Sequence, residues 1–152
     1  MKRLIHALCT VLLVIITATA TAQNTASHKK YLFNDYPAVI DFTEAQLSNF
    51  FIVKPGQNTS LALPGSFSLN GPMVSNISKY NRLQTVVIKL TAFNNIFFSL
   101  TKRKNDDNST VYTGHLFSRE YADGYELQCT NGNAYQLIKI ETEKLLPACS
   151  QQ

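Results

Sequence analysis

The chain has 152 residues, 45% of them hydrophobic, and a formal net charge of +4 at neutral pH. Two of its 14 basic residues, Lys2 and Arg3, lie in an N-terminal segment that we expect to be removed, so 12 basic residues remain against 10 acidic ones, or about +2. So small a charge gives no electrostatic case for nucleic-acid binding, which needs a clustered basic face. The remaining length suits one domain.

Residues 1–22 have the three parts of a cleavable secretory signal peptide. A basic start is followed by an apolar run from Leu4 to Ile16 and by small residues that end at Ala20-Thr21-Ala22. The run is shorter than the roughly 20 residues that span a bilayer. We therefore expect cleavage before Gln23, no transmembrane segment afterwards, and a secreted or periplasmic protein.

The polar residues 23–30 are predicted to be a flexible leader, and residues 31–152 a single β-rich domain. A short strand is expected over 37–42. Thr43 to Gln46 then has the form of a capping box, and three apolar residues follow on one helical face: Leu47, Phe50 and Phe51. The pattern predicts one short helix over residues 44–51.

Several turn-forming sequences follow the predicted helix. Pro55-Gly56, Pro64-Gly65 and Asn70-Gly71-Pro72 are turn signals, and they separate short predicted strands over 59–63 and 66–69.

The second half of the chain predicts an antiparallel meander. Asn94-Asn95 and Asn131-Gly132 are expected to form two-residue hairpin turns. Alternation places two apolar sets on one face: Val86, Ile88 and Leu90, then Ile96, Phe98 and Leu100. The five strands are predicted over 84–93, 96–101, 111–118, 125–129 and 134–141. With the earlier pieces, they make seven to nine strands in a sandwich or barrel-like sheet, with the helix against it.

Two cysteines remain after signal removal, Cys129 and Cys149. An even pair in an exported chain predicts a disulfide. A zinc site is a poor alternative, because it takes four ligands with close Cys or His pairs and His28 and His115 are far apart. No metal or other cofactor is predicted.

His115 is the one histidine within the predicted domain, and three carboxylates follow it in sequence: Glu120, Asp123 and Glu126. Together they could form an acid–base site. However, alternation from Val111 places His115 on the inward face with Thr113 and Phe117, so we expect a structural role.

Four tyrosines gather in the meander: Tyr112, Tyr121, Tyr125 and Tyr135. Exposed, they could stack on a ligand such as a sugar, although the absence of Trp weakens that interpretation. Packed on neighbouring strands, they would be ordinary cross-strand pairs, which we favour.

We therefore expect an exported, non-enzymatic β domain that binds a protein or another component of the cell envelope. Two alternatives stay open. The first is a small secreted hydrolase or lyase that uses His115 and the nearby carboxylates, which a cleft around His115 would favour. The second is a barrel-type carrier of an apolar ligand, which an open lumen lined by Phe and Tyr would favour.

Overall fold

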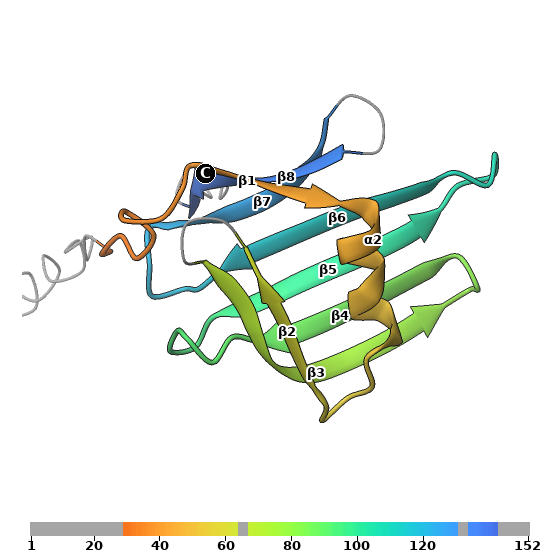
Figure 1. The fold of residues 1–152 in the computed structure, drawn as a ribbon, viewed down its shortest axis with the longest axis horizontal. Helices are drawn as coiled ribbons and strands as arrows, with labels where there is room; N and C mark the ends of the chain where they lie inside the picture. Colours follow the sequence, from red (N-terminus) through yellow and green to blue (C-terminus); the bar gives the residue numbers. More distant parts are fainter. Residues whose placement is uncertain (1–28, 64–66, 131–133, 143–152) are drawn as a thin grey trace, which may run out of the picture.

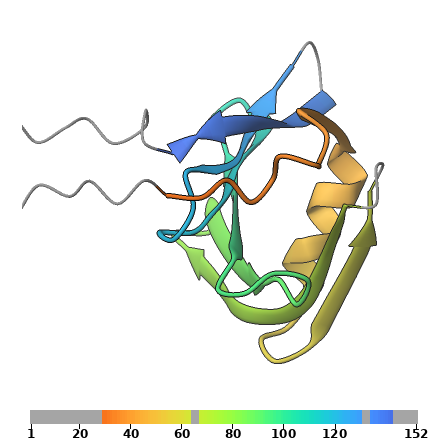
Figure 2. The same cartoon turned by 90° about the vertical axis from the view of Figure 1, so that its left-hand side faces the viewer.

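The computed structural model describes residues 29–63, 67–130 and 134–142. The strands form one antiparallel sheet in the order β1-β8-β7-β6-β5-β4-β3-β2, which curls into a half-barrel (Figures 1 and 2). They are β1 (Val39–Thr43), β2 (Asn58–Ala62), β3 (Ser68–Lys79), β4 (Leu83–Lys89), β5 (Phe97–Lys104), β6 (Thr110–Phe117), β7 (Asp123–Cys129) and β8 (Ala134–Glu141); the helical segments are α2 (Glu44–Asn49) and the 3₁₀ turn η1 (Phe50–Ile52).

From β2 to β8 each strand pairs with the next in sequence, and β1 joins the far side of β8. The mainly β, meander prediction is therefore confirmed. The sheet does not close, because α2 lies on its concave face between the two edge strands (Figure 2). The concave face is called the inner face below, and the opposite one the outer face.

The helix begins as the capping box predicts. The Thr43 hydroxyl oxygen accepts a hydrogen bond from the Gln46 backbone N–H, and the Gln46 side-chain oxygen accepts one from the Thr43 N–H. Both satisfy backbone donors that a helix start leaves without partners. Leu47, Phe50 and Phe51 are all buried, so the predicted face of the helix packs against the sheet.

The predicted turn at Asn70-Gly71-Pro72 is wrong, because β3 runs straight through it. Up to Pro72 this strand pairs with β2, and from Met73 onward it pairs with β4 on its other edge. A Cβ atom at Gly71 would lie 1.9 Å from the backbone oxygen of Lys89. The glycine is needed here for the close approach of two chain segments, which local sequence cannot distinguish from a turn.

The hairpin between β4 and β5 is confirmed, but its predicted two-residue turn is too short. The Leu90 N–H donates to the Ile96 oxygen at 3.0 Å, so the loop covers residues 91–95. Asn95 has a φ of 54°, in keeping with the tolerance of Asn for positive φ. Both predicted apolar sets are buried. The Asn131-Gly132 turn lies outside the described residues.

One end of the inner face is closed by five aromatic rings, called the aromatic plug below: Phe33, Tyr36, Phe67, Phe93 and Tyr125. The Phe33 ring centroid lies 5.1 Å from that of Tyr125 and 5.4 Å from that of Phe93, both edge to face. Such pairs contribute about 0.5–1.5 kcal/mol each beyond their buried area. The plug joins the N-terminal segment to the core of the sheet.

Candidate functional site

The structure places Asp123 apart from the other three residues considered for an acid–base site. Asp123 is 1% exposed, and its two carboxylate oxygens accept hydrogen bonds from the backbone N–H groups of Leu32 and Phe33, each at 2.8 Å. A buried carboxylate with both oxygens occupied in this way anchors the chain. Asp123 therefore has a structural role, in keeping with the expectation that these residues do not form an acid–base site.

Lys139 holds the same N-terminal segment from the neighbouring strand. Its ammonium group donates to the backbone oxygens of Phe33 and Tyr36, at 2.6 and 2.7 Å. Asp123 and Lys139 thus satisfy both donors and acceptors of one irregular segment, as buried backbone groups require. Sequence inspection could not have found this clamp, because its partners are 90 residues or more apart.

His115 faces outward, so the predicted inward orientation is wrong. On β6 the buried residues are Tyr112, Gly114 and Leu116, and His115 alternates with them on the exposed face. A one-residue error reverses every side chain of a strand. Two residues obscure the alternation of β6. Gly114 lies on the inward face but has no apolar side chain, and Phe117 is apolar but lies on the outward face.

A hollow of about 420 Å³ surrounds His115 on the outer face, where it is walled by two partly exposed rings, Phe97 and Phe117. Its other lining residues are Asn95, Ser99, Ser118, Arg119 and Glu120.

Strand register places Ser99 directly opposite His115, and His115 directly opposite Glu126. The order resembles the serine, histidine and acid of a hydrolase, but among the described residues no hydrogen bond joins the three. The Glu126 carboxylate instead accepts from the Gln128 amide at 3.1 Å, and Glu120 accepts from Asn95 at 3.2 Å. Backbone N–H groups that pair in the sheet are also not free to form an oxyanion hole.

The tyrosines mainly pack in the core. Tyr112, Tyr125 and Tyr135 are buried, and Tyr121 packs against the core from its margin. The rings of Tyr112 and Tyr135 meet edge to face at 5.4 Å. Burial, and secondarily the charge of Asp123, raises the pKa of Tyr125 to about 12, and its hydroxyl donates to the Pro37 oxygen at 2.6 Å.

A second hollow, of about 540 Å³, lies at the end of the inner face away from the aromatic plug and was not predicted. It is called the polar groove below, and it is lined by Ser78, Asn81, Arg82, Leu83, Gln84, Lys102, Lys104, Asn108, Thr110 and Tyr112.

Four of these residues form one row across adjacent strands, each directly opposite the next: Ser78 on β3, Gln84 on β4, Lys102 on β5 and Tyr112 on β6. The sequence of β5 contains a signal for this polar row. Its inward-facing residues are apolar at Phe98 and Leu100 and then become basic at Lys102 and Lys104.

Hydrogen bonds fix the floor of the groove. The Gln84 amide nitrogen donates to the Phe51 backbone oxygen at 3.2 Å and to the Asn76 side-chain oxygen at 2.8 Å. The Asn76 amide nitrogen donates in turn to the backbone oxygens of Phe51 and Val53, at 3.0 and 2.9 Å. These bonds attach η1 to β3 and β4, and they leave the Gln84 side-chain oxygen without a partner in the described part of the chain.

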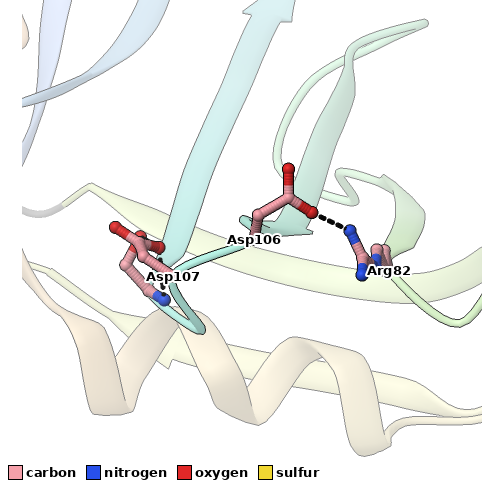
Figure 3. A network of polar contacts seen from close by, with 4 residues as sticks. Arg82, Asp106 and Asp107 are labelled. Carbon is pink, nitrogen blue, oxygen red and sulfur yellow. Dashed lines mark hydrogen bonds and ion pairs between the residues drawn. The ribbon is translucent and has the colours of Figure 1, made fainter.

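The groove carries excess positive charge. The Lys102 ammonium lies 4.8 Å from the centroid of the Phe51 ring, a cation–π contact, and has no carboxylate partner within the described ranges. Arg82 is paired with Asp106 on the β5–β6 loop (Figure 3). Asp107 on the same loop accepts hydrogen bonds from the Ser109 hydroxyl and N–H, which hold the pKa of Asp107 below its usual value.

Tyr112 supplies a hydroxyl group to the groove. The residue is 3% exposed, yet its hydroxyl has no hydrogen-bond partner among the described residues. Since no buried side-chain polar atom in those ranges lacks a partner, this hydroxyl is not fully enclosed by protein, and Tyr112 is one of the residues that line the groove. Burial raises the pKa of Tyr112, and the Glu44 carboxylate raises it further.

Neither a family model nor a curated protein nor a solved structure matches this chain. Within the described ranges, no helix is long and apolar enough to cross a membrane, and no three His, Cys, Asp or Glu side chains gather where a metal ion could bind. The predicted signal peptide and Cys149 lie outside those ranges. Cys129 is exposed at the end of β7, with its Sγ 3.4 Å from the Thr130 oxygen.

Proposed function

We propose that the protein is an exported, non-enzymatic binding domain whose polar groove takes a negatively charged component of the cell envelope. The observation that carries the proposal is Lys102. It is half-buried, positioned by the Phe51 ring, and without a carboxylate partner among the described residues. A cation held in this way is already in place for an anionic ligand, which lowers the entropy cost of binding.

The size of the groove favours a polymer or oligomer over a single small ion. Its volume of about 540 Å³ lies within the range of roughly 300–1,000 Å³ typical of ligand sites. The row from Ser78 to Tyr112 crosses three inter-strand spacings, on the order of 14 Å. Export, expected from residues 1–22, would bring the domain to such polymers.

The test is binding of the exported protein to a polyuronate, a sulfated polysaccharide, a polyphosphate and neutral dextran, each at low and high salt. We expect at least one anionic polymer to bind, more weakly as salt rises. Lys102→Gln should weaken that binding roughly tenfold, as loss of a charge-assisted hydrogen bond predicts.

Arg103→Gln is the matched control. Arg103 is the next residue on β5 and points to the outer face, so its loss removes the same charge without touching the groove. Failure of every anionic polymer to bind, or an equal effect of the two substitutions, would refute the proposed function.

A small hydrolase is the second candidate, and the row of Ser99, His115 and Glu126 beside the outer hollow is the observation that favours it. The apolar walls would suit an aryl or acyl ester. Turnover of such an ester that disappears in both Ser99→Ala and His115→Ala, with unchanged melting temperatures, would support catalysis. We expect neither substitution to abolish any activity detected.

The carrier alternative receives the least support. Its distinguishing feature was an open lumen lined by Phe and Tyr. The inner face is instead occupied by α2 and the aromatic plug, and the two hollows described above lie at the polar end and on the outer face.

A further inference from the structure

We infer that the ligand of the polar groove is an acidic sugar, that is, an oligosaccharide whose units carry carboxylate or sulfate groups alongside free hydroxyls. The inference rests on the proposed function and adds the chemical class of the ligand. It follows from which hydrogen-bonding groups line the groove and which of them lack a protein partner.

The groove offers an acceptor beside its cation. The Gln84 nitrogen is fully used by Phe51 and Asn76, so the free group of this side chain is its carbonyl oxygen. Lys102 lies directly opposite Gln84 on the next strand. A ligand that contacts both must therefore present a negative oxygen to Lys102 and a hydrogen-bond donor to Gln84.

A linear phosphate polymer does not satisfy that pair. Its inner units carry only accepting oxygens at neutral pH, so they would leave the Gln84 oxygen desolvated and unpaired, which weakens binding. A sugar hydroxyl donates and accepts at once. An acidic sugar therefore supplies both requirements over neighbouring atoms, whereas a phosphate polymer supplies only one.

Tyr112 is the second, independent observation. Tyr112 lines the groove next to Lys102 in the row, and the hydroxyl of this otherwise buried side chain lacks a partner in the described part of the chain. Hydroxyls of Ser78 and Thr110 extend the same mixed lining.

The cations present also suit a singly charged acid group. Arg82, whose planar guanidinium could bind a phosphate or sulfate through two parallel hydrogen bonds, is already paired with Asp106. Lys102 and Lys104 remain, and each is a point charge on a flexible stem. Such ammonium groups can pair with either a carboxylate or a sulfate.

The test is calorimetric titration of the exported protein with four defined oligomers: an oligogalacturonate, an oligomer of a sulfated sugar, a neutral malto-oligosaccharide and a linear polyphosphate. We expect one of the two acidic sugars to bind at least tenfold more tightly than the polyphosphate and the neutral sugar. Which of the two binds identifies the acid group.

Tyr112→Phe is the most specific variant, because the hydroxyl has no partner to lose among the described residues and the ring contacts stay in place. We expect weaker binding of the acidic sugar, about fivefold or more, with an unchanged melting temperature. Tyr125→Phe is the control, since the Tyr125 hydroxyl is used inside the protein and its loss should leave binding unchanged.

The outcomes separate the two proposals. Polyphosphate binding as tight as that of either acidic sugar would overturn the sugar inference and leave the proposed function standing. Binding of the neutral sugar at equal strength, or an effect of Tyr112→Phe no larger than that of Tyr125→Phe, would also overturn the inference. Absence of binding to every anion would refute the proposed function and, with it, the inference.

Discussion

The two ends of the inner face are built on the same strands but from different side chains. At one end, five rings of the aromatic plug fill the space between the sheet and the N-terminal segment. At the other end, Ser78, Gln84, Lys102 and Tyr112 line an open groove. The change occurs within single strands, since β5 passes from Phe98 and Leu100 to Lys102 along one face.

The two ends of the inner face therefore differ in what their side chains contribute. At the plugged end, apolar burial stabilises the fold by about 25 cal/mol per Å². The polar end keeps hydrogen-bonding groups without protein partners among the described residues, which costs stability and is typical of binding sites. Substitutions at the plugged end should therefore change stability, and those at the polar end should change binding.

Asp123→Ala should give the largest loss of stability. It leaves the N–H groups of Leu32 and Phe33 buried without an acceptor, and two charge-assisted hydrogen bonds predict a loss of about 3–5 kcal/mol. Urea unfolding measures it. Asp41→Ala is the control, because within the described ranges the side chain of the exposed Asp41 accepts from Gln136 alone, and its loss should cost less than about 1 kcal/mol. Similar losses in the two variants would contradict the structural role of Asp123.

A disulfide between Cys129 and Cys149 would stabilise the polar end of the sheet, where β7 ends at Cys129. It would close a loop of about 20 residues, and its reduction should cost roughly 3 kcal/mol. Thiol titration of the unfolded, unreduced protein decides between the two states of the cysteines. Two reactive thiols per exported chain, with no shift in melting temperature on reduction, would exclude the bridge.

Alkaline pH should destabilise the plugged end. The pKa of Tyr125 is about 12 in the folded protein against 10.0 ordinarily. Between these values the native state keeps a proton that the unfolded chain loses, so the free energy of unfolding falls as pH rises through that range, by up to roughly 2–3 kcal/mol. Tyr125→Phe should flatten this decline. An identical decline in the variant would assign it to other groups.

Asn76→Ala should cost about 1–2 kcal/mol, because it removes the bonds from β3 to the backbone oxygens of Phe51 and Val53. Thermal unfolding measures the loss. Ser75→Ala on the same strand is the control, since no side-chain hydrogen bond of Ser75 occurs within the described ranges. Equal effects would mean that the amide network does not hold η1 in place.

Lys102→Gln should have the smallest effect on stability, below about 1 kcal/mol, because only a cation–π contact with Phe51 is lost. Thermal unfolding of this variant measures how much the polar end contributes to stability. A loss as large as that of Asp123→Ala would make the polar end structural as well.

Local patterns predicted the parts of the fold that are held together locally. The capping box located α2, and period-2 alternation identified the buried faces of β4 and β5. The clamp on Leu32 was missed because its partners are 91 residues away. The face of β6 was misassigned because Gly114 hid the inward row. The polar groove was missed because its row joins four strands whose register only the folded sheet defines.

The N-terminal clamp also has a consequence for the order of folding. Leu32 and Phe33 contact Asp123, and β1 pairs with β8 near the other end of the chain. A chain that emerges from its N-terminus first therefore presents these residues long before their partners arrive. Closure of such distant contacts is slow, so the hairpins from β3 to β8 should form first and the N-terminal segment should dock last. Phe33 and Tyr36 would stay exposed until then, which makes late docking the step most open to aggregation.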